Sequence, residues 1–288
     1  MNFGFLPSAA MLALAPETLC EKLSNLGYRA VEWPLNWTHP QRTQCAFRRR
    51  IMRAAKNCGL EVNAAVIQLD PMHVDLSDCD KVTHELGRCL ETLCDMGIPN
   101  ANLFSGPAPW NNPVVIGRDL SEGGAWSRLM RSFDALIPLA ERLGIRIAVE
   151  NVWGMLCHDY YSLALLIHHY NHPVLGVNLD ISHDQLYGHD DSSWIVQFWN
   201  DKIFNVHLKD ACGIPTPGKF VFPLLGDGLI NWSAFFNAIS LTGYKGPLTI
   251  EFEADAYLRH VLNGDIWKAA QFSIENARTL SCNAERPT

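Results

Sequence analysis

The amino-acid sequence predicts an α/β protein with the fold of a (β/α)8 TIM barrel, on three observations. Short apolar runs alternate along the chain with longer segments whose apolar residues recur every three to four positions, as strands and helices do around a parallel sheet. There are eight of each, and 288 residues is close to the roughly 250 of a typical TIM barrel. No G-x-G-x-x-G motif follows any apolar run, which argues against a doubly wound sheet. We expect one domain spanning residues 1–288.

The eight apolar runs have the length and continuous hydrophobicity of strands that are buried on both faces of a parallel sheet. They are Asn2 to Phe5, Arg29 to Trp33, Leu60 to Ile67, Ala101 to Ser105, Ile145 to Glu150, Val174 to Asp180, Ile203 to Leu208 and Leu248 to Phe252.

The predicted helices lie between these strands. They are Pro16 to Leu26, Arg42 to Cys58, Ser77 to Met96, Ser121 to Leu143, Tyr160 to Tyr170, Ser192 to Lys202, Trp232 to Leu241 and Arg259 to Leu280. A glycine follows five of them, at positions 27, 59, 97, 144 and 243, where a left-handed residue can end a helix at little cost.

Composition excludes several classes of protein. No stretch of eighteen uncharged apolar residues is present, so we expect no membrane span. A formal net charge of −7 disfavours nucleic acid as a partner. Nine cysteines without CxxC spacing favour reduced thiols in a cytoplasmic protein. The opening sixteen residues are apolar but lack a preceding Lys or Arg, so we interpret them as mature sequence rather than a secretory signal.

Four consecutive predicted strands end in side chains that bind metals. Strands five to eight end at or near Glu150, Asp180, His207 and Glu251, at the end of the barrel where TIM-barrel chemistry takes place. Period-two alternation places Ala148, Asn178, Asn205 and Thr249 on the same inward face, one step below these four. Any one carboxylate could instead cap a helix or pair with a cation. Four on successive strands favour a metal centre.

A divalent cation would neutralise three carboxylates that otherwise repel one another at low dielectric. Mostly oxygen ligands with one imidazole suit Mn²⁺ best, then Mg²⁺ or Co²⁺, with Zn²⁺ and Fe²⁺ allowed on affinity grounds. The polar side chains one layer below are candidates to orient the ligands.

Six motifs carry a resemblance to a known family. They are GYRAVEW (27–33), AVEN (148–151), LDISH (179–183), VHLKD (206–210), GDGLINW (226–232) and GYKGPLTIEFE (243–253). At these motifs the sequence resembles the xylose-isomerase-like TIM barrels of the sugar phosphate isomerase/epimerase superfamily, over nearly the whole chain. The resemblance implies that Glu150, Asp180, His207 and Glu251 bind a divalent metal and that Glu150 and Glu251 also carry protons. It also implies a homo-oligomer.

The resemblance implies a metal-dependent carbohydrate isomerase or epimerase that works through an enediolate, with a small keto-sugar or polyol as substrate. The alternative is a lyase on the same scaffold, either a keto-inositol dehydratase or a deglycosidase of 3-keto-glycosides. A phosphodiesterase resembling endonuclease IV is disfavoured, because predicted strands three and four end near Gln68 and Phe104 rather than at further metal ligands. A ketohexose epimerase of the usual kind would carry a Glu and an Arg where this chain has Leu156 and Gly213.

Further residues are candidates for catalysis or substrate contact. His183, three residues beyond Asp180, could donate a proton or a hydrogen bond, or be a loop histidine. Lys209 could hold a substrate oxygen, or pair with Asp210 or Glu253. His158 and, by family likeness, Glu32 are substrate candidates; for Glu32 the alternative is a salt bridge with Arg29 or another nearby cation. Among the tryptophans that follow strands, Trp33, Trp110 and Trp153 are the candidates to stack on a sugar, and Trp37 is a fourth, with loop packing as the alternative for each.

Overall fold

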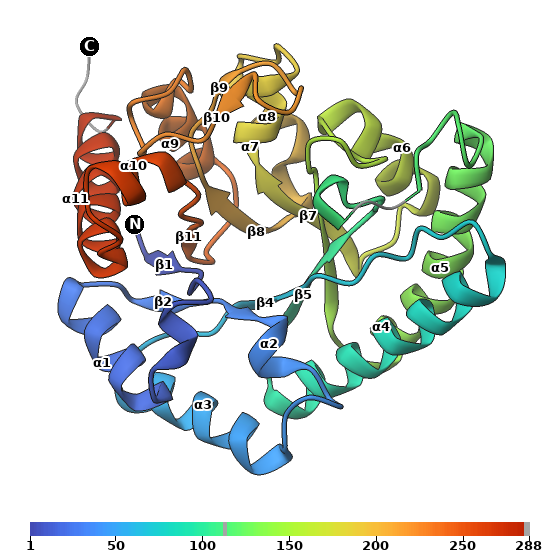
Figure 1. Cartoon of the computed structure of the whole chain (residues 1–288), viewed down its shortest axis with the longest axis horizontal. Helices are drawn as coiled ribbons and strands as arrows, with labels where there is room; N and C mark the ends of the chain where they lie inside the picture. Colours follow the sequence, from blue (N-terminus) through green and yellow to red (C-terminus); the bar gives the residue numbers. More distant parts are fainter. Residues whose placement is uncertain (112–113, 285–288) are drawn as a thin grey trace.

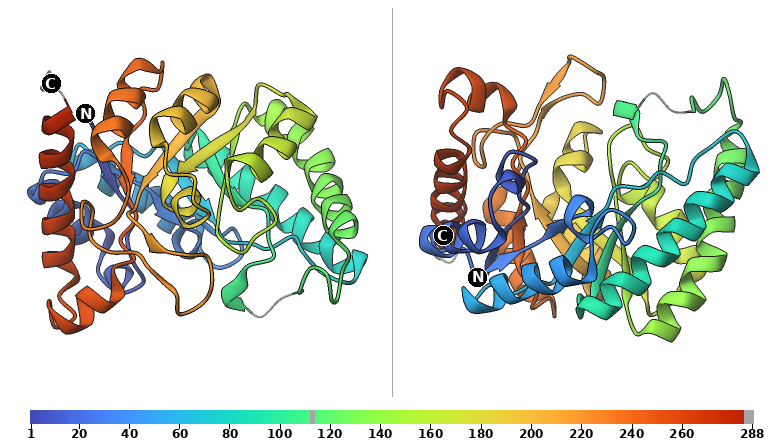
Figure 2. Two further views of the ribbon diagram at one scale, coloured as in Figure 1. Left: turned by 90° about the horizontal axis from the view of Figure 1, so that it is seen from above. Right: turned by 60° about the horizontal axis from the view of Figure 1, so that its bottom comes forward.

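The fold of the protein is a barrel of parallel strands surrounded by helices (Figure 1). A computed structural model describes residues 1–111 and 114–284; residues 112–113 and 285–288 of the expected 1–288 domain lie outside the described part. Both views in Figure 2 show the strands inside and the long helices outside. The predicted TIM barrel is confirmed.

Within the described residues, the parallel strands form one sheet in the order β2-β1-β11-β8-β7-β6-β5-β4-β3. The strands are β1 (Phe3–Phe5), β2 (Ala30–Val31), β3 (Trp33–Pro34), β4 (Ala64–Ile67), β5 (Asn100–Phe104), β6 (Arg146–Glu150), β7 (Leu175–Asp180), β8 (Ile203–Leu208) and β11 (Leu248–Ile250). β2 and β3 are two halves of the predicted second strand: β2 pairs with β1, and β3 pairs with β4. The ring therefore closes through residues 30–34.

The helices follow the predicted segments closely at most positions. They are α1 (Pro16–Leu26), α2 (Leu35–Thr38), α3 (Cys45–Asn57), α4 (Leu76–Met96), α5 (Glu122–Leu143), α6 (Tyr160–Tyr170), α7 (Ile181–Leu186), α8 (Ser192–Trp199), α9 (Trp232–Leu241), α10 (Asp255–His260) and α11 (Ile266–Ala284). Gly27, Gly97 and Gly144 end α1, α4 and α5 in the left-handed conformation, as predicted. Gly243 does not end a helix in this way, because α9 ends at Leu241 and the next residue, Thr242, is already extended.

Four features besides the divided second strand depart from the predicted elements. One is the short helix α2, which lies outside every predicted segment. The predicted helix from Arg259 to Leu280 is two helices, because Asn263 and Gly264 take positive φ angles between α10 and α11. The short helix α7 begins directly after β7, where no helix was predicted. An antiparallel hairpin of β9 (Cys212–Gly213) and β10 (Phe220–Val221) was also not predicted, and it projects beyond the end of β8.

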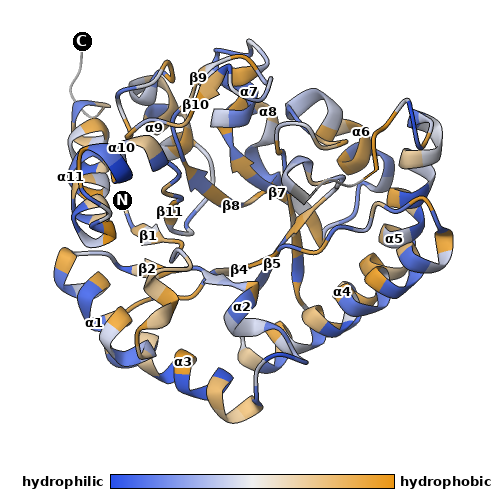
Figure 3. Ribbon diagram, in the orientation of Figure 1, coloured by the Kyte–Doolittle hydropathy of each residue, from blue (hydrophilic) through white to orange (hydrophobic). Residues whose placement is uncertain are grey.

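Apolar side chains fill the layer between the barrel and the helices. The largest fully buried side chains include Trp33, Tyr28, Phe133 and Phe235, and the surrounding helices carry hydrophobic and hydrophilic residues side by side (Figure 3). No helix in residues 1–111 or 114–284 combines the length and hydrophobicity that crossing a bilayer requires.

The inside of the barrel is polar, because five buried asparagines point inward. Asn100 donates to the backbone oxygen of Asn63 at 2.8 Å, and Asn63 donates to the side-chain oxygen of Asn205 at 3.2 Å. Asn102 and Asn178 continue the layer toward the carboxyl ends of the strands. Buried amides in a connected network hold one another in place, so these asparagines form a rigid layer inside the barrel.

Asp210, which follows β8, fixes the loop of the GDGLINW motif. Its carboxylate accepts hydrogen bonds from the backbone nitrogens of Gly226 (2.9 Å), Gly228 (3.1 Å) and Ile230 (3.3 Å) and from Nε1 of Trp232 (2.8 Å). A Cβ atom on Gly228 would lie 2.0 Å from Asp210 Oδ1, so glycine is required there. The motif therefore holds the loop beside the barrel mouth.

We expect Asp210→Ala to lower the free energy of unfolding by about 3 kcal/mol, because it leaves several buried donors without an acceptor. The melting temperature should fall by roughly 5–10 °C. Thermal unfolding followed by circular dichroism measures this, with Asp227→Ala in the same loop as the control, since Asp227 is exposed. Equal melting temperatures for the two variants would contradict the assignment.

Candidate metal centre

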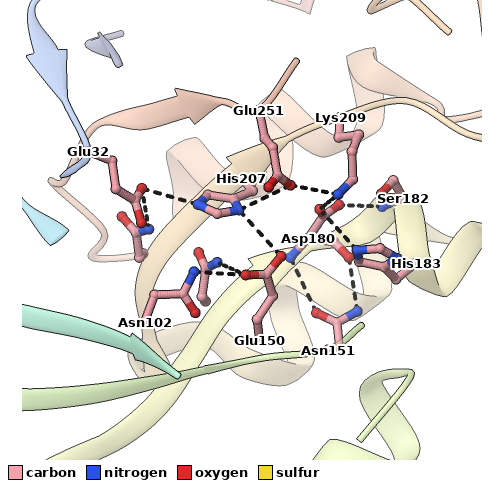
Figure 4. Close-up of polar contacts among 12 residues, drawn as sticks. Glu32, Asn102, Glu150, Asn151, Asp180, Ser182, His183, His207, Lys209 and Glu251 are labelled. Carbon is pink, nitrogen blue, oxygen red and sulfur yellow. Dashed lines mark hydrogen bonds and ion pairs between the residues drawn. The ribbon is translucent and has the colours of Figure 1, made fainter. Parts of the chain in front are cut away.

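The four predicted ligand residues converge at the carboxyl ends of β6, β7, β8 and β11. Glu150 and Asp180 are the last residues of β6 and β7, His207 is the second-last of β8, and Glu251 directly follows β11. One ligand atom from each lies within 4.8 Å of the others. Figure 4 shows the four side chains pointing toward one another. The four residues that the strand-end pattern predicts as ligands are thus brought together by the fold.

The tautomer of His207 is set by Glu32. Nε2 of His207 lies 3.1 Å from Glu32 Oε2, and Glu32 also accepts from Asn205 at 3.0 Å. Nδ1 consequently faces the cluster, 3.4 Å from Glu150 Oε1 and 3.5 Å from Glu251 Oε2. A carboxylate that receives the outer N–H of a ligating histidine is the usual support of a metal site.

Asparagines hold Glu150 in one orientation. Asn102 and Asn178 both donate to Oε2 of Glu150, at 2.8 and 2.9 Å. The other oxygen, Oε1, is left facing Nδ1 of His207. Asn178 therefore orients a ligand, as expected for the layer below.

Asp180 divides its two oxygens between a helix and the cluster. Oδ1 accepts from the backbone nitrogen of Ser182 at 2.9 Å and so caps the N-terminus of α7. Oδ2 is buried, and within the described residues it has no partner in hydrogen-bond geometry. Nζ of Lys209 lies 3.0 Å away and Nε2 of His183 3.5 Å away.

The electrostatics of the cluster fit a divalent cation. Burial raises the pKa of Glu150. Burial alone would lower the pKa of His207, but the carboxylates of Glu32, Glu150 and Glu251 together raise it well above its usual value. Three carboxylates around one imidazole thus favour a positive charge at Nδ1, which a metal ion supplies in place of the proton. Nδ1 of His207 and Oδ2 of Asp180 are buried atoms without hydrogen-bond partners in the described part of the chain. The residues therefore fit a metal with oxygen and nitrogen ligands.

Lys209 is buried beside the ligands and binds three carboxylates. Its Nζ lies 2.6 Å from Glu251 Oε2, 3.0 Å from Asp180 Oδ2 and 3.1 Å from Glu253 Oε2. Burial opposes the charge on Lys209, but these carboxylates raise its pKa well above the usual value. Of the two pairings considered from the sequence, the one with Glu253 is present; Asp210 instead holds the 226–232 loop.

A cavity of about 500 Å³ opens over the cluster. We call it the metal-centre cavity. Glu150, Glu251, His183 and Lys209 line it, and so do two of the predicted tryptophans, Trp110 and Trp153. Four further aromatic side chains, to which the sequence pattern gives no site role, also line the wall. They are Phe104, Phe220, Phe222 and Phe252. The alternating F-V-F of residues 220–222 is the sequence signal that could have identified two of them.

His183 is in the site rather than on an exposed loop. It lies in α7, is 2% exposed and accepts a hydrogen bond from the backbone nitrogen of Trp153 through Nδ1 at 3.3 Å. Burial, helped by the nearby charge of Lys209, lowers its pKa to about 3. The ring is therefore neutral at pH 7 and carries its proton on Nε2, next to Asp180.

Three predicted substrate contacts lie elsewhere. Trp33 is fully buried and packs against Trp37 with ring centroids 5.3 Å apart. Because neighbouring strand residues point to opposite faces, an inward Glu32 already implies an outward Trp33. His158 packs on Tyr187 at 4.4 Å. Among described residues, neither Trp33, His158 nor Glu32 lines the metal-centre cavity. Of the alternative partners for Glu32, it pairs with His207 and, in the described part of the chain, not with Arg29.

Comparison with known proteins places these features in a family. The model of the xylose isomerase-like TIM barrel family matches residues 20–275. A 3-dehydroshikimate dehydratase of Pseudomonas putida is 35% identical over 129 residues, which are 41% of this chain and 19% of that protein. The chain's matches span at most two fifths of the length of the curated relatives.

Two solved structures share the fold at low sequence identity. The IolI protein with a bound zinc atom has a TM-score of 0.75 and 17% identity, with all of both chains covered. An L-ribulose 3-epimerase has a TM-score of 0.76 and 17% identity, covering 99% of this chain and 96% of that one.

We expect Glu32→Ala to weaken Mn²⁺ binding by about 10- to 100-fold, because His207 loses the partner that fixes its tautomer. Isothermal titration calorimetry measures the affinity. Glu61→Ala is the control, since Glu61 is an exposed carboxylate whose side chain binds Asn2. Unchanged affinity in Glu32→Ala would refute the role given to Glu32.

Mn²⁺ at about 100 times its dissociation constant should stabilise the wild-type protein by about 2.7 kcal/mol, and so raise the melting temperature by roughly 5–10 °C. Asp180→Asn keeps an oxygen that can cap α7 but removes the charged ligand, so its thermal shift should be much smaller. Scanning fluorimetry with and without the metal measures both shifts. Equal shifts would remove Asp180 from the ligand set.

Proposed function

The chain belongs to the xylose isomerase-like TIM barrel family, and from this membership we propose that it is a divalent-metal-dependent isomerase or epimerase of a keto-sugar or polyol. In this proposal the reaction begins with removal of a proton from the carbon next to a carbonyl, and the intermediate is an enediolate. Mn²⁺ is our first choice of metal, because the ligands are three carboxylates and one imidazole.

One observation carries the proposal: Glu150 and Glu251 both belong to the ligand cluster and both line the same cavity. Two carboxylates on either side of a bound carbon can exchange protons with it from two directions. Their environments differ, as acid and base roles require. Burial raises the pKa of Glu150, whereas Lys209 and His207 outweigh burial and lower that of Glu251.

The bound metal supplies Lewis acidity that polarises the substrate carbonyl. Oε1 of Glu150, the oxygen not held by asparagines, is placed to accept or return the proton. Glu251 exchanges a proton with the substrate carbon from the side opposite Glu150. Return to the opposite face of the same carbon gives an epimer, and return to the neighbouring carbon gives an aldose–ketose isomer.

His183 and Lys209 provide the polar contacts to substrate in this proposal. Neutral His183 donates through Nε2, and Lys209 presents an ammonium group to the cavity wall. Trp110 and Trp153 give flat apolar surfaces against which the C–H face of a sugar packs.

A lyase is the second candidate, favoured by the match to a dehydratase. The same proton removal followed by loss of a β-substituent is elimination, in which neutral His183 donates a hydrogen bond to the leaving group. A phosphodiesterase is less favoured, because Gln68 and Phe104, rather than additional metal ligands, line the cavity on the side of β4 and β5.

We expect the Mn²⁺-loaded protein to incorporate deuterium from D₂O into one or more of a panel of ketoses, keto-inositols and 3-keto-glycosides, read by proton NMR after the metal is removed. Glu150→Gln and Glu251→Gln should each slow incorporation at least about 100-fold, because each removes a proton carrier, whereas Glu61→Gln should not. Metal content is measured in parallel.

The product of the same reaction identifies the branch. A new epimer or isomer supports the main proposal, and an unsaturated ketone or a free aglycone supports the lyase. Absence of exchange with every substrate by the metal-loaded protein would overturn the proposed proton transfer.

A further inference from the structure

A second cavity adjoins the metal-centre cavity. It has a volume of about 420 Å³ and lies between the β9–β10 hairpin and α10; we call it the hairpin cavity. Phe220, Phe222, Glu253 and Asp255 line both cavities. The two cavities therefore meet at these four side chains, and a ligand held at the metal centre has the hairpin cavity directly beyond them.

The walls contain more aromatic surface than one sugar ring can use. Six aromatic side chains line the metal-centre cavity, whereas a pyranose has only two faces on which to stack. Eight of the twelve residues around the hairpin cavity are apolar or aromatic, among them Val221, Leu224 and Tyr257. An apolar wall stabilises a ligand by removing apolar surface from water, which a bare polyol does not offer.

The aromatic wall is held in place by contacts with the candidate catalytic residues. Phe220 packs on Trp153 with ring centroids 4.8 Å apart, and on Phe222 at 5.2 Å. Phe222 in turn lies 4.8 Å from Nζ of Lys209 and 5.6 Å from the ring of His183. Gly213 allows the hairpin to close, since a Cβ there would lie 2.2 Å from the backbone oxygen of Lys219. A row of aromatic rings thus runs from the metal centre toward the hairpin cavity.

The charges around the hairpin cavity determine what kind of group it accepts. Three carboxylates, Asp227, Glu253 and Asp255, line it against a single cation, Arg259. A phosphate or carboxylate on the ligand would face an excess of negative charge. The apolar and aromatic majority of the wall favours an uncharged aromatic group over a hydrated cation, because a cation offers little apolar surface to bury.

We propose that the hairpin cavity binds an uncharged aromatic substituent attached to the sugar, so that the substrate is a conjugate of a sugar with an aromatic group rather than a free monosaccharide. This inference rests on the proposed function, which places the sugar unit at the metal centre. The substituent extends past Phe220 and Phe222 toward Val221 and Tyr257.

The test compares phenyl with methyl β-D-glucopyranoside as probes, because the pair differs only in the substituent. Dissociation constants are measured on the Mg²⁺-loaded full chain by ligand-observed NMR, which requires no turnover. We expect the phenyl glycoside to bind about tenfold or more tightly. Val221→Asp places a charge in the hairpin cavity and should abolish the preference. Val221 is 56% exposed and does not line the metal-centre cavity.

Leu229→Asp is the matched control, because Leu229 is exposed and lines neither cavity among the described residues. It should keep the preference for the phenyl glycoside. Tyr257→Ala should also reduce the preference, and it provides the test if Val221→Asp fails to fold. Equal affinity for the two glycosides, no binding of either, or a preference that survives both Val221→Asp and Tyr257→Ala would overturn the proposal.

The deuterium experiment separates this inference from the proposed function. Deuterium incorporation into free sugars without a phenyl preference would overturn the aromatic subsite and leave the proposed function standing. A phenyl preference that depends on Val221, without incorporation into any substrate, would support the subsite and count against the proposed chemistry.

Discussion

Six buried ionisable side chains and a seventh that is 16% exposed, Glu251, lie together at one end of the barrel, and the free energy of holding them there depends on mutual neutralisation. They are Glu32, Glu150, Asp180, His183, His207, Lys209 and Glu251. Isolated charges in such a place would be very costly. Each of these groups instead has a charged or amide partner within the same cluster, and the inward asparagines give the carboxylates directed hydrogen bonds. The polar barrel interior is thus a consequence of the site above it.

This constraint also explains the interruption of the second strand. Glu32 lies between β2 and β3, and its carboxylate reaches His207 on the far side of the ring. The two halves of the strand therefore pair with β1 and β4 in the sheet, and Glu32 between them contacts the candidate metal centre. Fold closure and ligand orientation depend on the same five residues.

The sequence predicts the barrel and the cluster of four candidate metal ligands because both follow from short-range patterns. Strand ends and the glycine-terminated helices α1 and α5 are encoded within a few residues, and parallel strands bring their carboxyl ends together. The hairpin wall is different: β9 and β10 are two residues each, too short for a periodic signal, and Phe220 reaches the site through packing on Trp153 and Phe222, which are distant or irregular in the sequence pattern. Helix α7 is six residues long and follows β7 without a loop, so it carries no periodic signal of its own, and its N-cap, Asp180, is also a candidate ligand.

The double use of Asp180 couples two parts of the site. One oxygen starts the helix that carries His183, and the other faces the cluster. A substitution of Asp180 that alters the candidate ligand therefore also disturbs the position of the neighbouring hydrogen-bond donor. Phe222, beside the hairpin, is held by side-chain packing against Phe220 and His183 instead. The shape of the cavity wall can accordingly be engineered through the hairpin, whereas Asp180 tolerates no change that leaves the rest of the centre as it is.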